Sequence, residues 1–509
     1  MHDRVVFEPV NVSQLTSDDK RKAMESLIFL TEKRDGTIKG RACANGSIQR
    51  NYIDKDDAAT PTVGTEAILL SGVIDAKEKR DVMTADIPNA LVQTEVDPED
   101  GIILMKIRGA MVDYLLEIDN LRYRDYVTVE DNKKILYVRM VKALYGMLKS
   151  SLLYYKKFRK DIEAIGFKVN PYDPCVANRI VDGKQHTVVW HVDDLKSSHV
   201  DPEVNRKFLT WLNKKYADDG IAEVKATFGK VHDYLGMTLD FTTDGVMKVD
   251  MRDYIDGMIR EFSEDVKTER TCPWTEKLFT ARDLDQKKAE EFHTFVAKGL
   301  LLCKRGRPDI QPAISFLSTR VRNPNQSDWD KLRRMMEFLW TTRDDVLKLS
   351  ADDIGTVQWY LDAAFAVHPD MKSHTGSIMT WGRGSIISIC TKQKTNSRSS
   401  TEAELISLDD ILSKVLWTLR FLEAQGVKVA KNIIYRDNTS SMKLEEGGRE
   451  SCGKRTRHFD IKYFYITDLI KRKEVTIQYR PTNEMIADFM TKPLTGAKFH
   501  TFRKVIMGN

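Results

Sequence analysis

The stretch TVVWHVDD at residues 187–194 decides the fold, because it joins strand-forming residues to two adjacent acids. A shorter stretch, LKSS at residues 195–198, follows the acids. Valine, threonine and tryptophan favour extended backbone, so we predict a β-hairpin with Asp193 and Asp194 at its turn. Neighbouring carboxylates repel unless a cation neutralises them, which makes the turn a candidate magnesium site. Asp-Asp pairs elsewhere in the chain indicate only solvated turns, and that reading stays open here.

A second strand-forming run, DVMTAD at residues 81–86, also ends in an acid. The next residues, IPNAL at 87–91, include Pro88, which can open a helix. Backbone amides at such a turn can face a phosphate. Asp86 is therefore either a helix-capping acid or part of a site.

Length and composition limit the class of protein. The chain has 509 residues, 41% hydrophobic and 30% charged, which predicts about three folded domains. No stretch approaches the roughly 18 apolar residues of a membrane span, and residues 1–4 do not resemble a secretory signal. We therefore expect a soluble, intracellular protein. The six cysteines form no C-x-x-C pair, which argues against disulfides and a zinc site; they are Cys43, Cys175, Cys272, Cys303, Cys390 and Cys452.

Charge is unevenly distributed along the chain. Residues 451–509 hold twelve Lys and Arg against five Asp and Glu, a net +7, whereas residues 97–131 carry a net −5. A basic C-terminal segment fits a polyanion partner. An ordinary solvated basic face explains the same charges equally well.

The texture of the sequence changes twice. Residues 1–250 mix strand and helix patterns, an α+β texture, and residues 251–350 are mainly helical. Residues 327–330 resemble a capping box followed by apolar residues at helical spacing. From residue 351 strands and helices alternate, an α/β texture. The polar, acidic stretch 342–356 is the best candidate for a linker.

Four further acids stand at the ends of predicted elements in the last part. Strands at 357–361 and 432–436 run into Asp362 and Asp437, and Asn483 can cap a helix that contains Asp488. Glu404 lies on a helix predicted over residues 401–424. Acids at strand ends can converge on one edge of a sheet. Glu404 is either a ligand there or the third residue of a capping box that begins at Thr401.

Several short motifs resemble one family of polymerases. DIPNA (86–90), ALYG (143–146) and VDD (192–194), with KGR (39–41) and DYLG (233–236), occur in the order and spacing of copia-type (Pseudoviridae) LTR retrotransposon Pol polyproteins. The resemblance implies an α+β multidomain fold, a right-hand polymerase followed by an α/β ribonuclease H-like domain. It also implies that Asp86, Asp193 and Asp194 hold two Mg²⁺ ions. The sequence does not distinguish Mg²⁺ from Mn²⁺, because both take hard oxygen ligands. Arg41 would clamp the triphosphate, and Gly146 would let the backbone approach nucleotide and template.

Two positions depart from the family pattern. Leu91 stands where the family has an aromatic residue that blocks a ribose 2′-hydroxyl. We therefore expect weaker exclusion of ribonucleotides than in a Leu91→Phe variant. His191 replaces a frequent tyrosine beside the paired acids, and we expect it to tune activity without abolishing it.

The last part carries motifs that resemble the copia-type ribonuclease H. These are SSTEAEL (399–405), YRDN (435–438), KRTRH (454–458) and IADFMTKPL (486–494). The resemblance implies that four acids bind two further Mg²⁺ ions: Asp362, Glu404, Asp437 and Asp488. Residues 480–484, RPTNE, lack the mobile histidine of many ribonucleases H. Six basic residues are expected to contact the phosphates of the hybrid: Lys392, Lys394, Arg398, Lys454, Arg455 and Arg457.

Together these features predict an RNA-directed DNA polymerase with ribonuclease H activity. Its partners would be RNA template, DNA primer, RNA–DNA hybrid and dNTPs, with no membrane, in cytoplasmic virus-like particles and the nucleus. We expect fingers and palm over 1–250, a helical thumb and connection over 251–350, and the ribonuclease H-like domain over 351–509. The resemblance also implies that capsid, protease and integrase segments, and the first piece of the fingers, precede residue 1. The alternatives are a decayed nucleic-acid-binding remnant and a host ribonuclease H with an inert polymerase scaffold.

Overall fold

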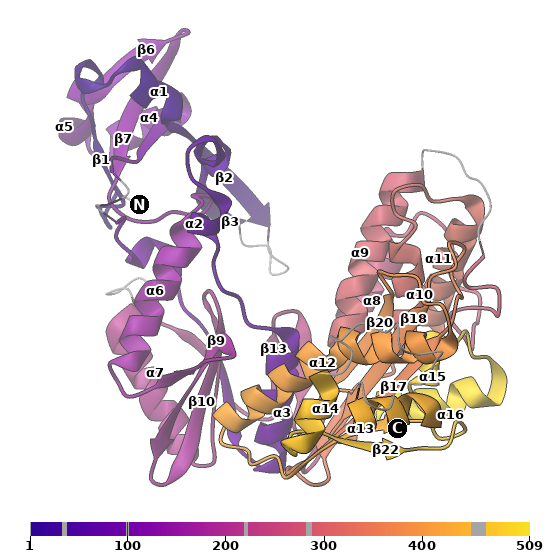
Figure 1. Ribbon diagram of the computed structural model, residues 1–509. Helices are drawn as coiled ribbons and strands as arrows, with labels where there is room; N and C mark the ends of the chain where they lie inside the picture. The colour runs from indigo at the N-terminus through magenta and orange to yellow at the C-terminus, as the bar shows by residue number, and fades with distance from the viewer. Residues whose placement is uncertain are drawn as a thin grey trace.

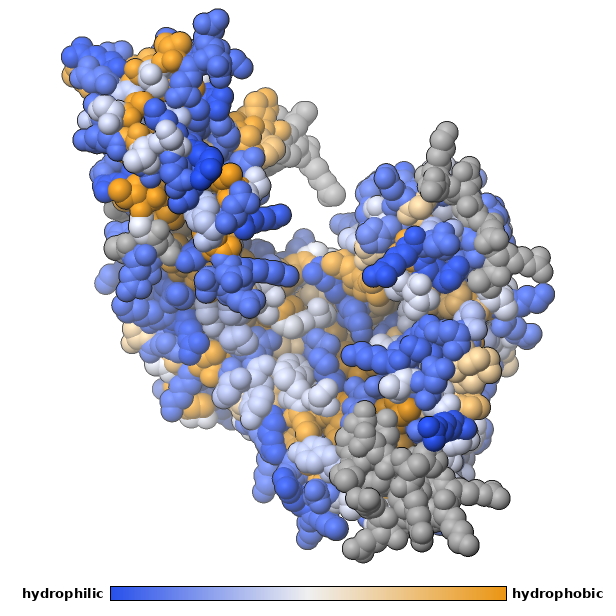
Figure 2. Space-filling view, turned by 45° about the horizontal axis from the view of Figure 1, so that its top comes forward, coloured by the Kyte–Doolittle hydropathy of each residue, from blue (hydrophilic) through white to orange (hydrophobic). Residues whose placement is uncertain are grey.

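The computed structural model describes residues 2–32, 38–97, 99, 101–217, 222–280, 288–448 and 465–509. Over these ranges the chain forms four β-sheets flanked by helices. Figure 1 shows two arms that rise from a common base, the N-terminal sheet on one side and helices α8–α11 on the other. The space-filling view in Figure 2 shows that the molecule is hollowed between these arms.

The first sheet has the order β1-β7-β5-β2-β3, with β6 added beside β7. Its strands are β1 (Phe7–Pro9), β2 (Met24–Glu32), β3 (Ile38–Asn45), β5 (Leu104–Arg108), β6 (Val127–Glu130) and β7 (Lys133–Met140). Helix α4 (Ala110–Ile118) packs on β5 and β7. The buried side chains of Met105, Leu136 and Val138 belong to one small apolar cluster that holds this arm together.

The second sheet carries the predicted hairpin. Its order is β12-β4-β11-β10-β9-β8, formed by β4 (Asp81–Asp86), β8 (Lys168–Asn170), β9 (Asp173–Val181), β10 (Lys184–His191), β11 (Asp194–His199) and β12 (Lys225–Thr227). The β10–β11 pair is antiparallel with His191 opposite Asp194, which confirms the hairpin. Val192 adopts φ 56° at the turn. Pro88 opens no α-helix, because Asn89 takes a left-handed conformation and only a 3₁₀ turn, Ala90–Gln93, follows.

Helices cover the second sheet and supply its core. They are α3 (Thr65–Lys77), α6 (Ser150–Glu163) and α7 (Pro202–Tyr216). Trp190 of β10 stacks edge-on against Phe158 of α6, with ring centroids 5.4 Å apart. Phe158 also meets Tyr216 of α7. These large buried rings fix the strands that carry the acids.

The predicted helical zone is confirmed. It consists of α8 (Arg252–Glu261), α9 (Ala289–Arg305), α10 (Gln311–Ser318) and α11 (Gln326–Thr341). The capping box of α11 uses Asn325 and Asp328, and its N-cap lies two residues before the predicted start.

The linker predicted over residues 342–356 is wrong in part, because this stretch contains strand β16 (Leu347–Ala351). That strand lies between β15 (Met247–Asp250) and β19 (Gly382–Arg383) in a sheet continued by β14 (Met237–Asp240) and β13 (Val231–Tyr234).

The fourth sheet has the order β20-β18-β17-β21-β22. Strands β17 (Thr356–Ala364), β21 (Lys431–Arg436) and β22 (Thr476–Tyr479) are parallel. Strand β18 (His374–Thr380) pairs antiparallel with β17 on one side and with β20 (Ile387–Lys392) on the other. Helix α12 (Ser400–Ala424) packs across β17 and β18, as its predicted apolar stripe required. The remaining helices are α13 (Thr439–Gly447), α14 (Tyr465–Lys471), α15 (Asp488–Thr491) and α16 (Gly496–Met507). Asn483 caps none of them, since α15 begins at Asp488 itself.

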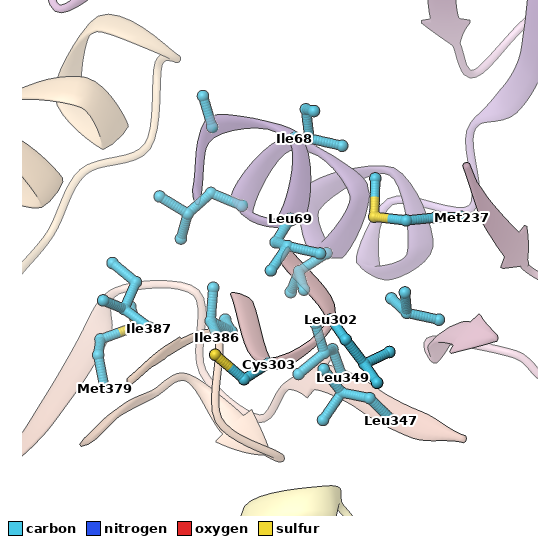
Figure 3. Packing of buried hydrophobic residues seen from close by; sticks show 14 of the residues in the cluster. Ile68, Leu69, Met237, Leu302, Cys303, Leu347, Leu349, Met379, Ile386 and Ile387 are labelled. Carbon is cyan, nitrogen blue, oxygen red and sulfur yellow. The ribbon is translucent and has the colours of Figure 1, made fainter. Parts of the chain in front are cut away.

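Helix α3 joins the second sheet to the rest of the molecule. Figure 3 shows Leu69 of α3 pointing toward Leu302 and Cys303 of α9 and toward Leu347 and Leu349 of β16. At its end, Lys77 Nζ donates to the carbonyls of Ala351 and Asp352, each at 2.9 Å. The apolar core therefore runs from the second sheet into the helical zone and the last part without a break. No helix in the described ranges is long and apolar enough to cross a membrane.

Candidate active sites

Three acids meet at one end of the second sheet. Asp86 ends β4, and its register partner on the neighbouring strand is Asp194, the first residue of β11. Asp193 occupies the hairpin turn, where its carbonyl accepts a hydrogen bond from the amide of Ile87 at 3.1 Å. The pairing of β4 with β11 thus brings together acids that are more than a hundred residues apart in sequence.

The charges of these acids are poorly compensated by protein groups. Burial raises the pKa of Asp193, and the neighbouring charge of Asp86 raises it further, while Arg41 opposes the rise. The pKa of Asp194 is raised by burial and then by Asp193 and Asp86. Carboxylates that raise one another's pKa in this way gain most from a bound cation. Hard oxygen donors fit Mg²⁺ or Mn²⁺.

A cavity of about 570 Å³ opens in front of Asp86 and Asp193. Arg41 of β3 and Tyr145 also line it. The Arg41 guanidinium lies over the Tyr145 ring, 4.9 Å from its centroid, and the Tyr145 hydroxyl donates to Asp193 Oδ2 at 3.5 Å. Burial raises the pKa of Tyr145 to about 12. The structure therefore brings the predicted phosphate clamp Arg41 to the same cavity as the acids.

Sequence reasoning missed two residues of this site. Tyr145 lies in the ALYG motif at residues 143–146, and no role for its side chain follows from that motif. Lys225 of β12 is the register partner of Asp86 on the side away from Asp194, and it lines the cavity. Its strand has only three residues, too short to be recognised from a sequence pattern. A cation thus stands directly beside the first acid.

Packing within the protein accounts for leucine at position 91 and glycine at position 146. Leu91 is 4% exposed within the core below the sheet, and it is the next residue, Val92, that lines the cavity. Gly146 has φ 91°, and a Cβ there would lie 1.9 Å from the carbonyl oxygen of Ala44. Gly146 therefore lets its own segment pack on β3. The predicted roles of both residues toward a nucleotide stay predictions.

A second group of acids lies on the fourth sheet. Asp362 of β17, Glu404 of α12 and Asp437, which follows β21, bring carboxylate oxygens within 4.8 Å of one another. Asp362 and Glu404 are buried, and Asp437 is half-buried. Asp437 Oδ2 also accepts a hydrogen bond from the Thr482 hydroxyl at 2.9 Å. Three oxygen donors at this spacing can hold one divalent ion.

The structure excludes a capping role for Glu404. The N-cap of α12 is Ser399, whose hydroxyl accepts from the amide of Glu402 at 3.2 Å. Glu404 lies one half-turn further, and burial raises its pKa to about 8 although Arg436 opposes the rise. The fully buried Arg436 lies 3.2 Å from Glu404 Oε2 and 2.8 Å from Glu445 Oε1. This arginine orients Glu404 toward the other two acids.

The fourth predicted ligand, Asp488, is not in that group. Its side chain is 1% exposed, and its two carboxylate oxygens are bound by Lys492 at 2.5 Å and by Lys498 at 2.7 Å. Lys492 also lies 3.4 Å from Asp362 Oδ2. The residues present therefore fit one divalent ion at three acids, with the fourth acid paired to lysines.

The predicted basic residues are only partly described. Lys392 is bound to Asp370 at 2.6 Å, whereas the side chains of Lys394 and Arg398 are exposed. Arg398 stands just before α12, where its amide donates to Glu402. Lys454, Arg455 and Arg457 lie outside the described residues. Of the described part of this set, Lys394 and Arg398 are thus the better placed to meet a polyanion.

Comparison with known proteins gives one family match. Residues 11–275 match the family model described as reverse transcriptase (RNA-dependent DNA polymerase). Among curated proteins, the Pol polyprotein from transposon TNT 1-94 of Nicotiana tabacum is 23% identical over 490 residues, 93% of this chain and 35% of that protein. The Ty1-LR2 Gag-Pol polyprotein of Saccharomyces cerevisiae is 23% identical over 495 residues, 94% of this chain and 26% of its own length. The chain thus spans about a third or less of these relatives.

A solved structure shares the fold. The foamy viral protease-reverse transcriptase dRH, solved in complex with ds DNA, superposes with a TM-score of 0.53 at 13% identity, covering 94% of this chain and 68% of that one. At this identity the likeness concerns the fold alone. Together with the four sheets, it confirms the predicted class, a multidomain α+β polymerase with an α/β ribonuclease H-like part.

Proposed function

Because the chain belongs to the reverse transcriptase (RNA-dependent DNA polymerase) family and resembles copia-type retrotransposon Pol polyproteins over most of its length, we propose that it copies RNA into DNA and degrades the RNA of the resulting hybrid. One observation carries the proposal. Asp86 and Asp193 line a cavity that also holds Arg41, and Asp194 is the register partner of Asp86. These acids would supply oxygen donors for a divalent ion next to a clamp for a triphosphate.

In the polymerase site each residue has a distinct task. Asp86, Asp193 and Asp194 would hold two Mg²⁺ ions, which, when bound, activate the primer hydroxyl and neutralise the triphosphate. The planar fork of Arg41 grips phosphate oxygens, and Tyr145 keeps that fork over its ring. Lys225, the register partner of Asp86 on the neighbouring strand β12, would add positive charge at the wall of the same cavity. The proposed dNTP substrates, RNA template and DNA primer follow from the family match.

The ribonuclease H proposal rests on the second group of acids. Asp362, Glu404 and Asp437 would hold Mg²⁺, which supplies Lewis-acid chemistry at a phosphodiester. The resemblance adds Asp488 as a fourth ligand for a second ion. Contacts to the 2′-hydroxyl would select the RNA strand. Lys394 and Arg398, with Lys392 and the basic residues of 454–457, would bind the hybrid's phosphates.

The first, second and fourth sheets support a division of the chain, whereas the third sheet, β13-β14-β15-β16-β19, takes strands from all three parts. We assign residues 1–250 to fingers and palm, 251–350 to thumb and connection, and 351–509 to the ribonuclease H-like domain. The first two sheets lie in the first range and α8–α11 in the second. The parallel strands β17, β21 and β22 lie in the third.

Primer extension on an RNA template and cleavage of a labelled hybrid test the function. We expect Asp194→Asn to abolish extension and spare cleavage, and Asp437→Asn to do the opposite. Extension that survives Asp194→Asn would refute the polymerase assignment. If folded wild-type protein shows neither activity but binds hybrid, it is the decayed nucleic-acid-binding remnant. Cleavage without extension would favour a dedicated ribonuclease H with an inert polymerase scaffold.

A further inference from the structure

The two oxygens of Asp488 already have cationic partners. Lys492 Nζ lies 2.5 Å from Oδ1 and Lys498 Nζ lies 2.7 Å from Oδ2. Asp488 is 1% exposed, whereas the side chains of Lys492 and Lys498 are 39% and 40% exposed, so the buried carboxylate depends on these two ammonium groups for its neutralisation. A divalent ion that uses Asp488 as a ligand has to displace at least one ammonium group.

Lys492 also lies close to Asp362, which is one of the three clustered acids. Its Nζ lies 3.4 Å from Asp362 Oδ2, and the Thr491 hydroxyl donates to the same oxygen. Asp362 is a member of the three-acid group with Glu404 and Asp437. The ammonium group therefore stands between Asp362 and Asp488, in the place of an ion that these two acids would share.

The fold determines where Lys492 stands. It directly follows the short helix α15, four residues after Asp488, and its amide donates to the Asp488 carbonyl at 2.9 Å. Pro493 comes next and cannot continue the helix. The side chain is 39% exposed, so it has room to swing outward. Lys498 comes from α16, a separate helix.

We propose that Lys492 is an internal cation of this site: its ammonium occupies the position between Asp362 and Asp488, and the substrate-free protein binds a single divalent ion at Asp362, Glu404 and Asp437. The inference rests on the proposed ribonuclease H function and departs from a site in which all four acids hold metal. Without the lysine, the freed oxygens of Asp362 and Asp488 accept a second ion. Lys492 thus determines how many divalent ions the site binds when no substrate is present.

Counting bound Mn²⁺ tests this directly. The full chain carries Asp86→Asn and Asp194→Asn to remove ions from the polymerase site, and isothermal titration calorimetry with Mn²⁺ alone gives the stoichiometry. We expect one ion in this parent, two after adding Lys492→Met, and one after adding Lys492→Arg, which keeps the charge. Lys504→Met, an exposed lysine on α16, serves as the matched control and should match the parent.

Each outcome of the titration decides a different claim. If the parent binds two ions, the proposed role of Lys492 is wrong. It is also wrong if the Lys492→Met variant binds one ion and has the same melting temperature as the parent. Adding Asp437→Asn to the parent should remove the single ion. A parent that binds no Mn²⁺ overturns the proposed metal site itself, and the inference with it.

Discussion

A tyrosine connects the cation and the anion of the polymerase site. Tyr145 places its ring under the Arg41 guanidinium and its hydroxyl toward Asp193. Its pKa, raised by burial to about 12, keeps the hydroxyl protonated at any physiological pH, so it acts as a donor to the carboxylate. The contact with Asp193 is long, at 3.5 Å, and contributes little. The ring contact with Arg41 is the larger effect.

Removing that ring should weaken nucleotide binding. A cation–π contact is worth about 0.5 to 2 kcal/mol, so we expect Tyr145→Ala to raise the KM for dNTP by about 2- to 30-fold. Steady-state primer extension measures this. Tyr145→Phe keeps the ring and should stay close to wild type. Equal KM values for the alanine variant and the wild type would show that Tyr145 does not orient Arg41.

The raised pKa of Glu404 makes stability depend on pH. Burial lifts it from 4.5 to about 8, so between these values the folded protein keeps a proton that the unfolded chain has lost. The free energy of unfolding then falls as pH rises through this window. In EDTA, we expect the melting temperature of the wild type to fall relative to that of Glu404→Gln as the pH rises from 5 to 8. Parallel melting profiles would contradict the assignment.

At the scale of helices, close packing of α9 on α10 depends on a glycine. A Cβ on Gly299 would lie 2.2 Å from Ile314 Cδ1, and Ile314 is fully buried. We expect Gly299→Ala to destabilise the protein by about 1 to 3 kcal/mol, measured by urea unfolding. Ile314→Val removes Cδ1, the nearer of the two carbons that the added Cβ would meet, and leaves Cγ1 at 2.9 Å, so the double variant should recover part of the stability that Gly299→Ala loses. Gly257→Ala on α8, where the added Cβ meets only Arg260 at 4.0 Å, is the control and should be neutral or stabilising.

Elements with strong local patterns were predictable from the sequence. The β10–β11 hairpin and helix α12 follow from side-chain periodicity, and both are confirmed. Glu404 could not be assigned from the sequence because a capping box that begins at Thr401 explains it as well as a ligand role does, and only the structure places the N-cap at Ser399. The partners Lys225 of Asp86 and Lys492 of Asp362 depend on strand register and tertiary packing, which no local pattern contains. The expected linker failed for the same reason, since β16 gains its order from strands far away in sequence.

At the scale of the molecule, the helix that carries Glu404 also touches the second sheet. Near the far end of α12, the Trp417 indole donates to the Tyr172 carbonyl at 2.8 Å, and Asn170 donates to the Phe421 carbonyl at 3.3 Å. Lys414 adds an ion pair with Glu66 of α3 at 3.2 Å. Glu404 and Trp417 are about 20 Å apart along this helix. One helix therefore spans from the acids Asp362, Glu404 and Asp437 to the second sheet.

Weakening the contact between α12 and the second sheet should make the distance between the two proposed active sites less well defined. We expect Trp417→Ala to widen the distribution of RNA cut sites measured from the primer 3′ end, because the cleavage site is no longer held at one distance from the hairpin. Total cleavage of a blunt hybrid should stay within about 2-fold of wild type, since the acids are untouched. Lys428→Ala, an exposed residue beyond α12, should leave the cut sites unchanged. An unaltered distribution in Trp417→Ala would rule out this coupling.

Strand β16 has a practical consequence for recombinant work. It lies between β15, from residues 247–250, and β19, from residues 382–383. If the gene is cut at residue 350, the C-terminal product contains β19 without its neighbour β16. The N-terminal product contains most of β16, which pairs with β15 but has lost β19. Unpaired strand edges of this kind recruit other chains and aggregate. Expression of the last part alone is therefore expected to give inclusion bodies, and the intact chain is the sensible unit to purify.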